Sequence, residues 1–245
     1  YTLGSHMRRG AEKYGVKTVS AEVKRVELEG KDKVLYTSDS EVKASAVIIA
    51  TGATHRHLEI PGEDMFIGRG VSFCATCDGM FYRGKDVVVI GGGNTAVSEA
   101  MYLSGICKSV TVVHRRDELR ASGLEREKLE KTENVKIVYD SVPVEFVGND
   151  SLEGIKIKNV KNNEEKFIDC AGVFVCVGMI PQTKLFEGII TLDESGYILA
   201  DESTKTSIEG VFAAGDVRSK EVRQIVTATG DGAVAAYHAE RFLNF

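Results

Sequence analysis

The stretch that most restricts the fold of this chain is residues 85–114, where an apolar run, a glycine turn and a helical pattern follow one another. The patterns predict a buried strand at 85–90, a helix at 94–104 and a second strand at 109–114. The turn between the first strand and the helix consists of Gly91, Gly92, Gly93, Asn94, Thr95 and Ala96, which fits G-x-G-x-x-A. In this order, the glycines permit a tight turn and let a pyrophosphate approach the backbone at the helix N-terminus. We therefore expect a dinucleotide site here; a glycine turn without a ligand is the alternative.

The end of the second strand indicates which dinucleotide binds. An NAD site carries an acidic residue about 20 residues after the glycines, where it binds the ribose hydroxyls. This chain instead has His114, Arg115 and Arg116, with Arg120 one helical turn further on. Arginines bind a 2′-phosphate, which a carboxylate would repel. The sequence predicts NADP(H) rather than NAD(H); a solvated cationic helix start is the alternative interpretation.

A pair of cysteines precedes the glycine turn. Cys74 and Cys77 belong to the sequence Cys-Ala-Thr-Cys-Asp-Gly at residues 74–79. Two thiols at this spacing can cycle between dithiol and disulfide, and one of them often has a pKa near neutrality. A zinc site would need two further ligands at suitable spacing, and the sequence offers none, so we expect no metal. Beside a dinucleotide turn, the pair predicts electron transfer between a nicotinamide and a disulfide.

Composition excludes several other classes of protein. The 245 residues suffice for one or two domains. A net charge of −5 offers no basic face for nucleic acid, and no apolar run approaches the ~20 residues of a membrane span. No signal peptide is recognisable, and 5 cysteines, an odd number, do not form a secreted disulfide framework. These features favour a cytoplasmic protein.

The rest of the chain predicts mostly strands. Residues 7–15 favour a helix that ends at Gly15, although residues 4–7 also look like an expression-vector scar. Further helices are expected at residues 119–131 and 224–245, and strands at 16–19, 22–28, 33–37, 42–49, 135–139, 142–147, 152–160, 167–177, 198–200 and 210–214. Thr51 with Gly52, and Gly215 with Asp216, follow the carboxyl ends of two strands, where ligands bind in α/β proteins. For each pair, an ordinary turn or loop is the alternative.

Taken together, these motifs closely resemble the low-molecular-weight thioredoxin reductases, which are NADPH-dependent flavoproteins. The resemblance rests on residues 50–53, 74–79, 91–96, 114–116 with 120, 215–216 and 223–224. It implies an α/β fold of two Rossmann-like three-layer domains and, usually, a homodimer. A discontinuous FAD domain would comprise residues 1–54 and 183–245. An NADPH domain at residues 55–182, carrying the cysteine pair, would be inserted into it.

The resemblance also implies roles for individual residues. Electrons would pass from NADPH through FAD to the Cys74–Cys77 disulfide and on to thioredoxin. Cys77 would face the flavin, Cys74 would attack the partner, and Asp78 would be the general acid and base, unless it only opens an Asp-Gly turn. The FAD site would include Thr51, Gly52, Gly215, Asp216, Arg223, Gln224 and Ile225. Hinges for domain rotation are expected near residues 54–61 and 178–183.

One departure from the family leaves alternatives open. The family's first strand and G-x-G-x-x-G turn, which hold the FAD pyrophosphate, are absent from these residues. A protein of these residues alone is therefore expected to bind FAD weakly and to purify colourless. A peroxiredoxin-reducing flavoprotein is a rival, although such proteins favour NADH and lack the arginine pair. Ferredoxin-fed relatives likewise lose the His-Arg-Arg sequence. A non-catalytic NADP-binding or redox-sensing module is the remaining alternative.

Overall fold

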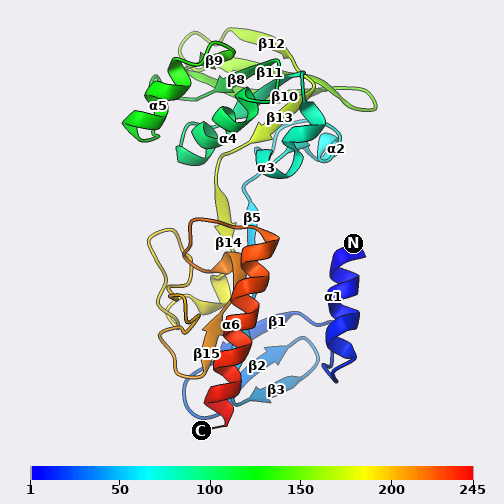
Figure 1. Ribbon diagram of the computed structural model, residues 1–245, viewed down its shortest axis with the longest axis vertical. Coiled ribbons are helices and arrows are strands. Elements are labelled where there is room, and N and C mark those ends of the chain that lie inside the picture. Colours follow the sequence, from blue (N-terminus) through cyan, green and yellow to red (C-terminus); the bar gives the residue numbers. More distant parts are fainter. Residues whose placement is uncertain (1, 245) are drawn as a thin grey trace. The chain divides into compact units, whose positions relative to one another are not determined.

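The structure, a computed structural model, describes residues 2–244. The chain divides into two compact units (Figure 1). We call residues 1–54 with 181–245 the discontinuous unit, and residues 55–180 the inserted unit. The chain passes between them at β5 (Ala53–His55) and β14 (Met179–Pro181), two short strands that pair with each other. The assignment of the units to FAD and to NADPH stays a prediction.

The inserted unit contains the predicted β-turn-α-β order. Its helices are α2 (Glu63–Phe66), α3 (Ala75–Asp78), η1 (Gly79–Tyr82), α4 (Asn94–Ser104) and α5 (Gly123–Glu130). Its strands are β6 (Val71–Ser72), β7 (Asp86–Ile90), β8 (Ser109–Val113), β9 (Val135–Val138), β10 (Ser141–Gly148), β11 (Leu152–Asn159), β12 (Glu165–Asp169) and β13 (Gly172–Val175). Strands β7 and β8 and helix α4 confirm the elements predicted around the glycine turn.

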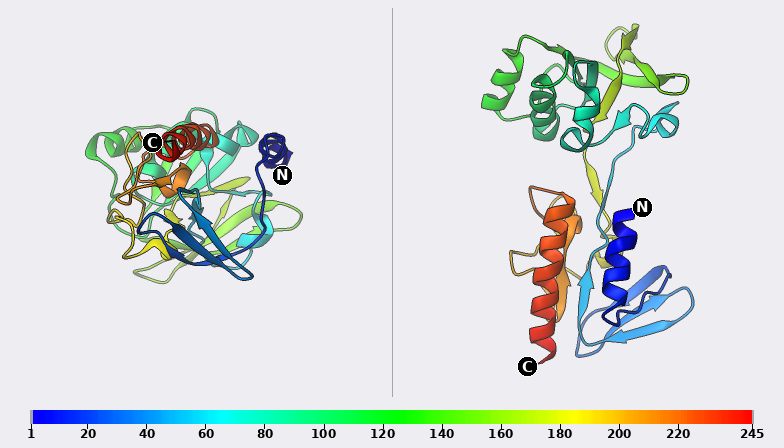
Figure 2. Two further views of the ribbon diagram at one scale, coloured as in Figure 1. Left: turned by 90° about the horizontal axis from the view of Figure 1, so that it is seen from below. Right: turned by 45° about the vertical axis from the view of Figure 1, so that its right-hand side comes forward.

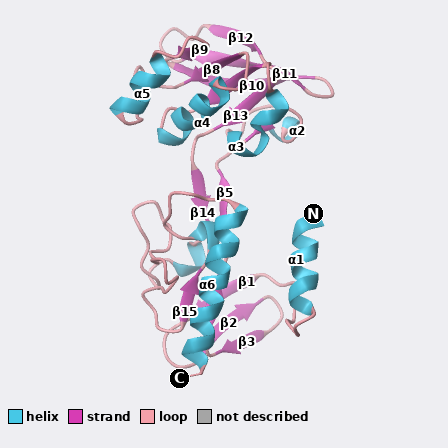
Figure 3. Ribbon diagram, viewed as in Figure 1, coloured by secondary structure: helices cyan, strands magenta, loops and turns pink. Residues whose placement is uncertain are grey.

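Three layers build this unit. The central sheet is parallel in the order β6-β13-β7-β8-β9, and a separate antiparallel sheet has the order β10-β11-β12. Figure 3 shows helices α4 and α5 beside the parallel strands, which they contact. The sequence of β7 explains the layering, because successive side chains of a strand point to opposite faces. Val87 and Val89 pack with helix α4, whereas Val88 and Ile90 pack with Phe146 of the antiparallel sheet.

The discontinuous unit has two small sheets. Its elements are α1 (Thr2–Glu12), β1 (Val23–Glu27), β2 (Lys33–Thr37), β3 (Glu41–Ala44), β4 (Val47–Ile49), η2 (Lys184–Phe186), β15 (Val211–Ala213), η3 (Gly215–Val217) and α6 (Ile225–Leu243). Strands β1, β2 and β3 are antiparallel, and β15 pairs with β4 in parallel. Ala235 and Ala239 of α6 pack on Phe212 of β15, and their small side chains allow close contact. Both views of Figure 2 show α1 apart from α6, and none of the described side chains of α1 is buried. Parallel sheets with helices confirm the α/β class.

Four expected elements differ from the structure. Residues 16–19, all described, form no strand; Val16 and Val19 are exposed. The strand expected at 42–49 is two strands, because β3 pairs with β2 whereas β4 pairs with β15. Helix α5 begins only at Gly123, because Leu119 is buried against the core in an extended segment. Residues 198–200 form only isolated bridges at Ile198.

The strand expected at residues 167–177 is also wrong in its continuity. The chain leaves the antiparallel sheet after β12 and enters the parallel sheet at β13. Between them, the N–H of Cys170 donates to the main-chain carbonyl of Glu153, and the N–H of Ala171 donates to the main-chain carbonyl of Asp86. Phe167 is 52% exposed, on the outer face of β12. A mostly apolar run, in which only Asp169 is charged, therefore crosses between two sheets where sequence reading expected one strand.

Candidate active site

The two cysteines form a disulfide at the start of helix α3. Cys74 and Cys77 are joined, and their Cα atoms lie 5.3 Å apart. Cys74 is the N-cap residue of α3, so its Sγ accepts the N–H of Cys77 at 3.2 Å. The hydroxyl of Thr76 lies 3.3 Å from the same sulfur. Both groups can stabilise negative charge on Cys74 when the pair is reduced.

Asp78 follows the disulfide and is held by a serine that the sequence did not single out. The hydroxyl of Ser72 donates to Asp78 Oδ2 at 2.7 Å. The same hydroxyl accepts the N–H of Cys74 at 3.2 Å. Ser72 is buried at the end of β6, with 5% of its surface exposed. A serine two residues before a cysteine pair is a weak signal, which is why sequence reading missed it.

The other three cysteines are free and lie in surroundings that disfavour thiolates. Burial raises the pKa of Cys107 and raises the pKa of Cys170 to about 12. The pKa of Cys176 is raised well above its ordinary value by burial and by the neighbouring Glu99 carboxylate. The cysteines outside the disulfide are therefore protonated and weakly nucleophilic at neutral pH.

The glycine turn has no room for side chains at its first two positions. Gly91 has φ 149°, and a Cβ there would lie 2.4 Å from the carbonyl oxygen of Cys176. A Cβ on Gly92 would lie 2.3 Å from Nδ1 of His114. Gly93 is the N-cap of α4. A Cβ on Gly93 would have room, because it would lie 4.0 Å from Nη2 of Arg120. The turn therefore presents bare backbone, as a pyrophosphate requires.

The predicted nucleotide residues lie around this turn. Asn94 and Thr95 are exposed in the first turn of α4. The side-chain oxygen of Asn94 accepts the N–H of Ser122 at 3.1 Å, which ties the segment before α5 to the glycine turn. His114 is buried beneath Gly92, and burial lowers its pKa. Its Nε2 has no hydrogen-bond partner among the described residues.

A cavity of about 580 Å³ opens beside the turn within the inserted unit. Gly91, Gly92, His114, Arg115 and Arg120 line it, and none of its described lining residues is acidic. Arg116 is exposed but is not part of the lining. Within residues 2–244, none of these three arginines forms an ion pair. Uncompensated arginines at an acid-free cavity suit a phosphorylated ligand.

The opposite wall of the cavity was not predicted. Arg56, His57 and Leu58 line it. The buried carboxylate of Glu63 accepts the N–H of Leu58 at 2.9 Å and that of Glu59 at 2.7 Å. His57 Nδ1 lies 3.5 Å from the same carboxylate. The sequence signal was the Pro-Gly-Glu sequence at residues 61–63, next to residues 54–61, where only a hinge was expected.

A second unpredicted contact links the cavity to helix α3. Cys176, another lining residue, donates its thiol to Glu99 Oε2 at 2.9 Å. Glu99 of α4 also accepts a backbone hydrogen bond from Ala75, the residue after Cys74. Burial raises the pKa of Glu99. The Glu99 carboxyl thus joins the end of β13 to the start of α3.

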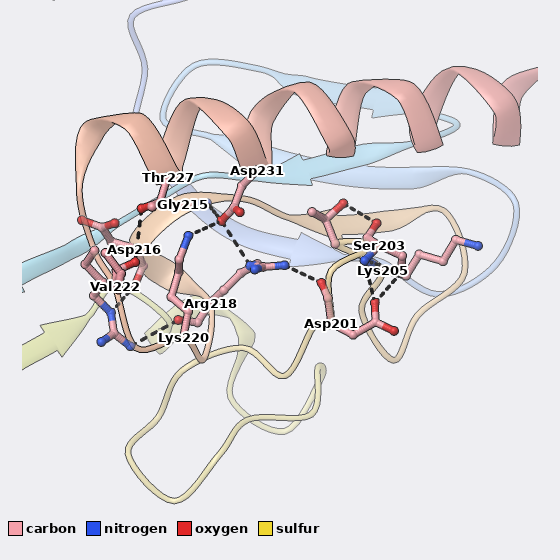
Figure 4. A network of polar contacts seen from close by, with 12 residues as sticks. Asp201, Ser203, Lys205, Gly215, Asp216, Arg218, Lys220, Val222, Thr227 and Asp231 are labelled. Atoms are coloured by element: carbon pink, nitrogen blue, oxygen red, sulfur yellow. Dashed lines mark hydrogen bonds and ion pairs between the residues drawn. The ribbon is translucent and has the colours of Figure 1, made fainter.

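The discontinuous unit holds the residues predicted for FAD. Gly215 has φ 77°, and its N–H donates to Asp231 of α6 at 2.9 Å (Figure 4). The same Asp231 oxygen pairs with Lys220 at 2.8 Å and with the buried Arg218 at 3.2 Å. Asp216 Oδ1 is buried and has no partner in the described part of the chain. A buried acceptor without a partner suits a ligand hydroxyl.

The remaining predicted FAD residues lie in the same unit. Arg223 packs over the ring of Tyr197, 3.9 Å from its centre, and donates to the Asp216 carbonyl at 3.4 Å. Gln224 is the N-cap of α6 and Ile225 is its exposed first residue. The hydroxyl of Thr51 and the carbonyl of Gly52 bond the main chain of Gln182 at 2.7 and 2.9 Å, a partner that the sequence did not predict.

Neither a metal site nor a membrane-spanning helix is found among the described residues. Among the described residues, no group of three or more His, Cys, Asp or Glu side chains is arranged to hold a metal ion. None of the described helices combines the length and the apolar character needed to cross a membrane.

Comparison with known proteins agrees with this geometry. Residues 3–232 match the family of pyridine nucleotide-disulphide oxidoreductases. A thioredoxin reductase of Rickettsia bellii is 48% identical over 247 residues, which cover 99% of this chain and 80% of the relative. The chain belongs to the thioredoxin reductases of this family. The match includes residues 4–7, which the structure places in α1, and so supports a native helix there.

Solved structures give the same result. The crystal structure of thioredoxin reductase from Streptococcus pyogenes is 42% identical with a TM-score of 0.92, covering 99% of this chain and 80% of that chain. The thioredoxin reductase from Giardia duodenalis is 36% identical with a TM-score of 0.94, covering 100% of this chain and 81% of that chain. The expected fold family is therefore confirmed.

Proposed function

We propose that this chain is an NADPH-dependent thioredoxin-disulfide reductase, in which electrons pass from NADPH through FAD to the Cys74–Cys77 disulfide and then to thioredoxin. The observation that carries the proposal is the disulfide itself, which lies on a unit built around a dinucleotide turn. Membership of the thioredoxin reductases supports the same reaction. No described feature favours a peroxiredoxin-reducing or a non-catalytic module.

The residues present fit NADPH and the ribityl region of FAD, whereas the FAD pyrophosphate turn of the family lies outside these residues. Bound NADPH and FAD supply hydride transfer and a two-electron relay between nicotinamide and sulfur. Arg115 and Arg120 at the acid-free cavity would hold the 2′-phosphate of NADPH, with Arg116 beside them. The bare backbone of Gly92 and Gly93 would take the pyrophosphate. Asp216, whose Oδ1 is buried without a partner, would bind a hydroxyl of the FAD ribityl region.

The thiol chemistry follows from the positions of the two sulfurs. Asp78 takes the proton from the Cys74 thiol, and the Cys77 N–H and the Thr76 hydroxyl stabilise the resulting thiolate. The thiolate attacks one sulfur of the partner's disulfide, and the other sulfur leaves with the bonding electrons and takes a proton from Asp78. Cys77 then loses its proton and attacks Cys74 Sγ, which breaks the bond between Cys74 and the partner and restores the intramolecular disulfide. The partner's second sulfur leaves with the bonding electrons and takes up the proton from Cys77, so the partner is released as a dithiol.

A protein partner also suits the surface next to the disulfide. Met80 and Phe81, in the turn η1 that follows Asp78, are 54% and 75% exposed. Exposed apolar side chains beside a reactive group are typical of a protein-binding surface. Thioredoxin is the partner that the family favours. A homodimer and a cytoplasmic location are also proposed; the three free thiols support the second, because they form no disulfide framework.

The direct test is NADPH-dependent reduction of a thioredoxin by the FAD-loaded protein. Cys74→Ser and Cys77→Ser are each expected to abolish thioredoxin reduction, because each removes one sulfur of the relay. Cys107→Ala removes a buried thiol outside the relay and is the matched control; it should retain turnover. Undiminished thioredoxin reduction by either serine variant would overturn the proposal. NADH tested in place of NADPH separates this enzyme from peroxiredoxin-reducing relatives.

A further inference from the structure

The redox turn is closed by three hydrogen bonds, two of which meet at one buried hydroxyl. Ser72 Oγ donates to Asp78 Oδ2 at 2.7 Å and accepts the N–H of Cys74 at 3.2 Å. The N–H of Asp78 in turn donates to the carbonyl of Cys74 at 3.1 Å. The three residues therefore form a ring that includes the main chain of one redox cysteine and the side chain of the predicted acid and base.

The hydroxyl of Ser72 donates its hydrogen to the carboxylate of Asp78. A serine hydroxyl has a single hydrogen to donate. The Cys74 carbonyl also lies within reach of Ser72 Oγ, but at 3.4 Å, whereas the Asp78 oxygen lies at 2.7 Å. The shorter contact to a charged acceptor is the stronger one. Ser72 therefore binds one carboxylate oxygen, and the other oxygen of Asp78 is left for proton exchange.

The position of Ser72 is fixed by the fold. It is the last residue of β6, it is 5% exposed, and β6 pairs in parallel with β13, where Ser72 lies opposite Phe174. The strand thus anchors the hydroxyl, and the hydroxyl anchors the four-residue helix α3 at both ends. A helix this short has little stability of its own. Without Ser72, the N–H of Cys74 and Oδ2 of Asp78 would each lose a hydrogen-bond partner.

We propose that Ser72 is a positioning residue of the redox centre, which holds the Asp78 carboxylate at a fixed place relative to Cys74 so that protons pass between Asp78 and sulfur. The inference rests on the proposed function, in which Asp78 takes the proton from the Cys74 thiol and returns it to the leaving thiolate of the partner. Ser72 itself forms and breaks no covalent bond. It acts only through Asp78, and its contact with the Cys74 N–H fixes the place of its hydroxyl.

The test is a double-mutant comparison on the FAD-loaded protein. Ser72→Ala is expected to lower thioredoxin turnover about 10-fold, equivalent to about 1.4 kcal/mol, and to move the pH–rate profile. Ser72→Thr keeps the hydroxyl and should restore both. In an Asp78→Asn background, Ser72→Ala should cost less than 2-fold, because groups that act through one another are not additive.

A second readout needs neither flavin nor thioredoxin. The dithiothreitol-reduced protein is alkylated with iodoacetamide across a pH series, and the modification of Cys74 is followed by mass spectrometry. Ser72→Ala should shift the pH dependence of alkylation, whereas a loss of folding alone would expose all five cysteines. Ser109→Ala is the matched control, since Ser109 Oγ donates to Asp86 Oδ1 at 2.6 Å in the same unit, away from the disulfide. This control should leave the alkylation profile unchanged.

The outcomes distinguish the inference from the function beneath it. If Asp78→Asn leaves turnover unchanged, the acid and base role of Asp78 fails and the inference fails with it. If Asp78→Asn impairs turnover but Ser72→Ala moves neither profile, only the role of Ser72 is refuted. A full 10-fold loss from Ser72→Ala in the Asp78→Asn background would also refute it, because Ser72 would then act independently of Asp78.

Discussion

Gly92 lies directly against the buried ring of His114: a Cβ on Gly92 would lie 2.3 Å from Nδ1 of that ring. Gly92 belongs to the glycine turn before α4, and His114 directly follows β8 and precedes Arg115 and Arg116. Glycine is therefore required at this position for two reasons. A side chain would collide with His114, and it would also keep a ligand away from the backbone. The histidine supports the turn from below, while its neighbour Arg115 lines the cavity.

Gly92→Ala is expected to destabilise the protein by about 1–3 kcal/mol, because overpacking forces a buried ring to move. The same displacement should weaken NADPH binding, since we propose that the turn holds the pyrophosphate. Gly93→Ala is the control for stability, because a Cβ there has only Arg120 at 4.0 Å. Chemical denaturation measures the free energy of unfolding of both variants. Equal stability of the two would contradict the steric argument.

The arginines at the end of β8 predict the choice of nucleotide. Replacing Arg115 and Arg116 together with alanine should reduce the preference for NADPH over NADH at least about 100-fold, because each charge-assisted contact to a 2′-phosphate contributes about 1.5–3 kcal/mol. Affinities for both nucleotides, measured by titration, give the preference. Arg83→Ala is the control: Arg83 is exposed and precedes the opposite, amino-terminal end of β7. An unchanged preference in the double variant would refute the assignment.

Local sequence patterns predicted correctly the β-turn-α-β order of the inserted unit. The order β7, α4, β8 was predicted because a short apolar run, a glycine turn and a helical period follow one another. Residues 167–177 were misjudged because Asp169 and Gly172, which interrupt a mostly apolar run, were not interpreted as a crossing between two sheets. Partner strands decide where such a run breaks, and partners distant in sequence are not visible in a local window.

The candidate site shows the same division. The cysteines, glycines and arginines were found because their chemistry requires those residue types at fixed spacing. Ser72, Glu63 and Asp231 were not found, because each acts through hydrogen bonds that form only when the chain is folded. Single serine and carboxylate residues are common on any chain. Only the burial and the distances identify these three as supports of the site.

Asp231 is expected to support the fold of the predicted FAD site. Its carboxylate neutralises Arg218 and Lys220, which are 4% and 11% exposed, and accepts the N–H of Gly215. Asp231→Asn leaves a buried guanidinium without its counter-charge, which costs about 3 kcal/mol or more. FAD retention should fall with it, because Gly215 precedes Asp216.

Glu164→Gln is the matched control for Asp231. Glu164 pairs with Lys166 at 3.3 Å, and both side chains are more than half exposed. An exposed pair of this kind contributes at most about 1 kcal/mol. Denaturant titration of both variants, with flavin absorbance as a second measurement, checks the prediction. A loss in Asp231→Asn no larger than in Glu164→Gln would show that the buried network does not stabilise the unit.

The Glu99–Cys176 contact predicts a pH dependence of stability. Burial raises the pKa of Glu99 in the folded protein, so the folded state binds this proton more tightly than the unfolded state. The contribution of Glu99 to stability is therefore complete below its unfolded pKa and is lost as the pH rises through the raised folded pKa.

Glu99→Gln cannot titrate and should remove this decline, so the stability difference between variant and wild type should shift in favour of the variant as the pH rises from 4 to 8. Denaturant titrations across this range measure the difference, and carboxylates elsewhere cancel in the comparison. Cys176→Ala, which removes the thiol donor but keeps the carboxyl, should retain a decline with rising pH. A difference between Glu99→Gln and wild type that does not change with pH would contradict the burial argument.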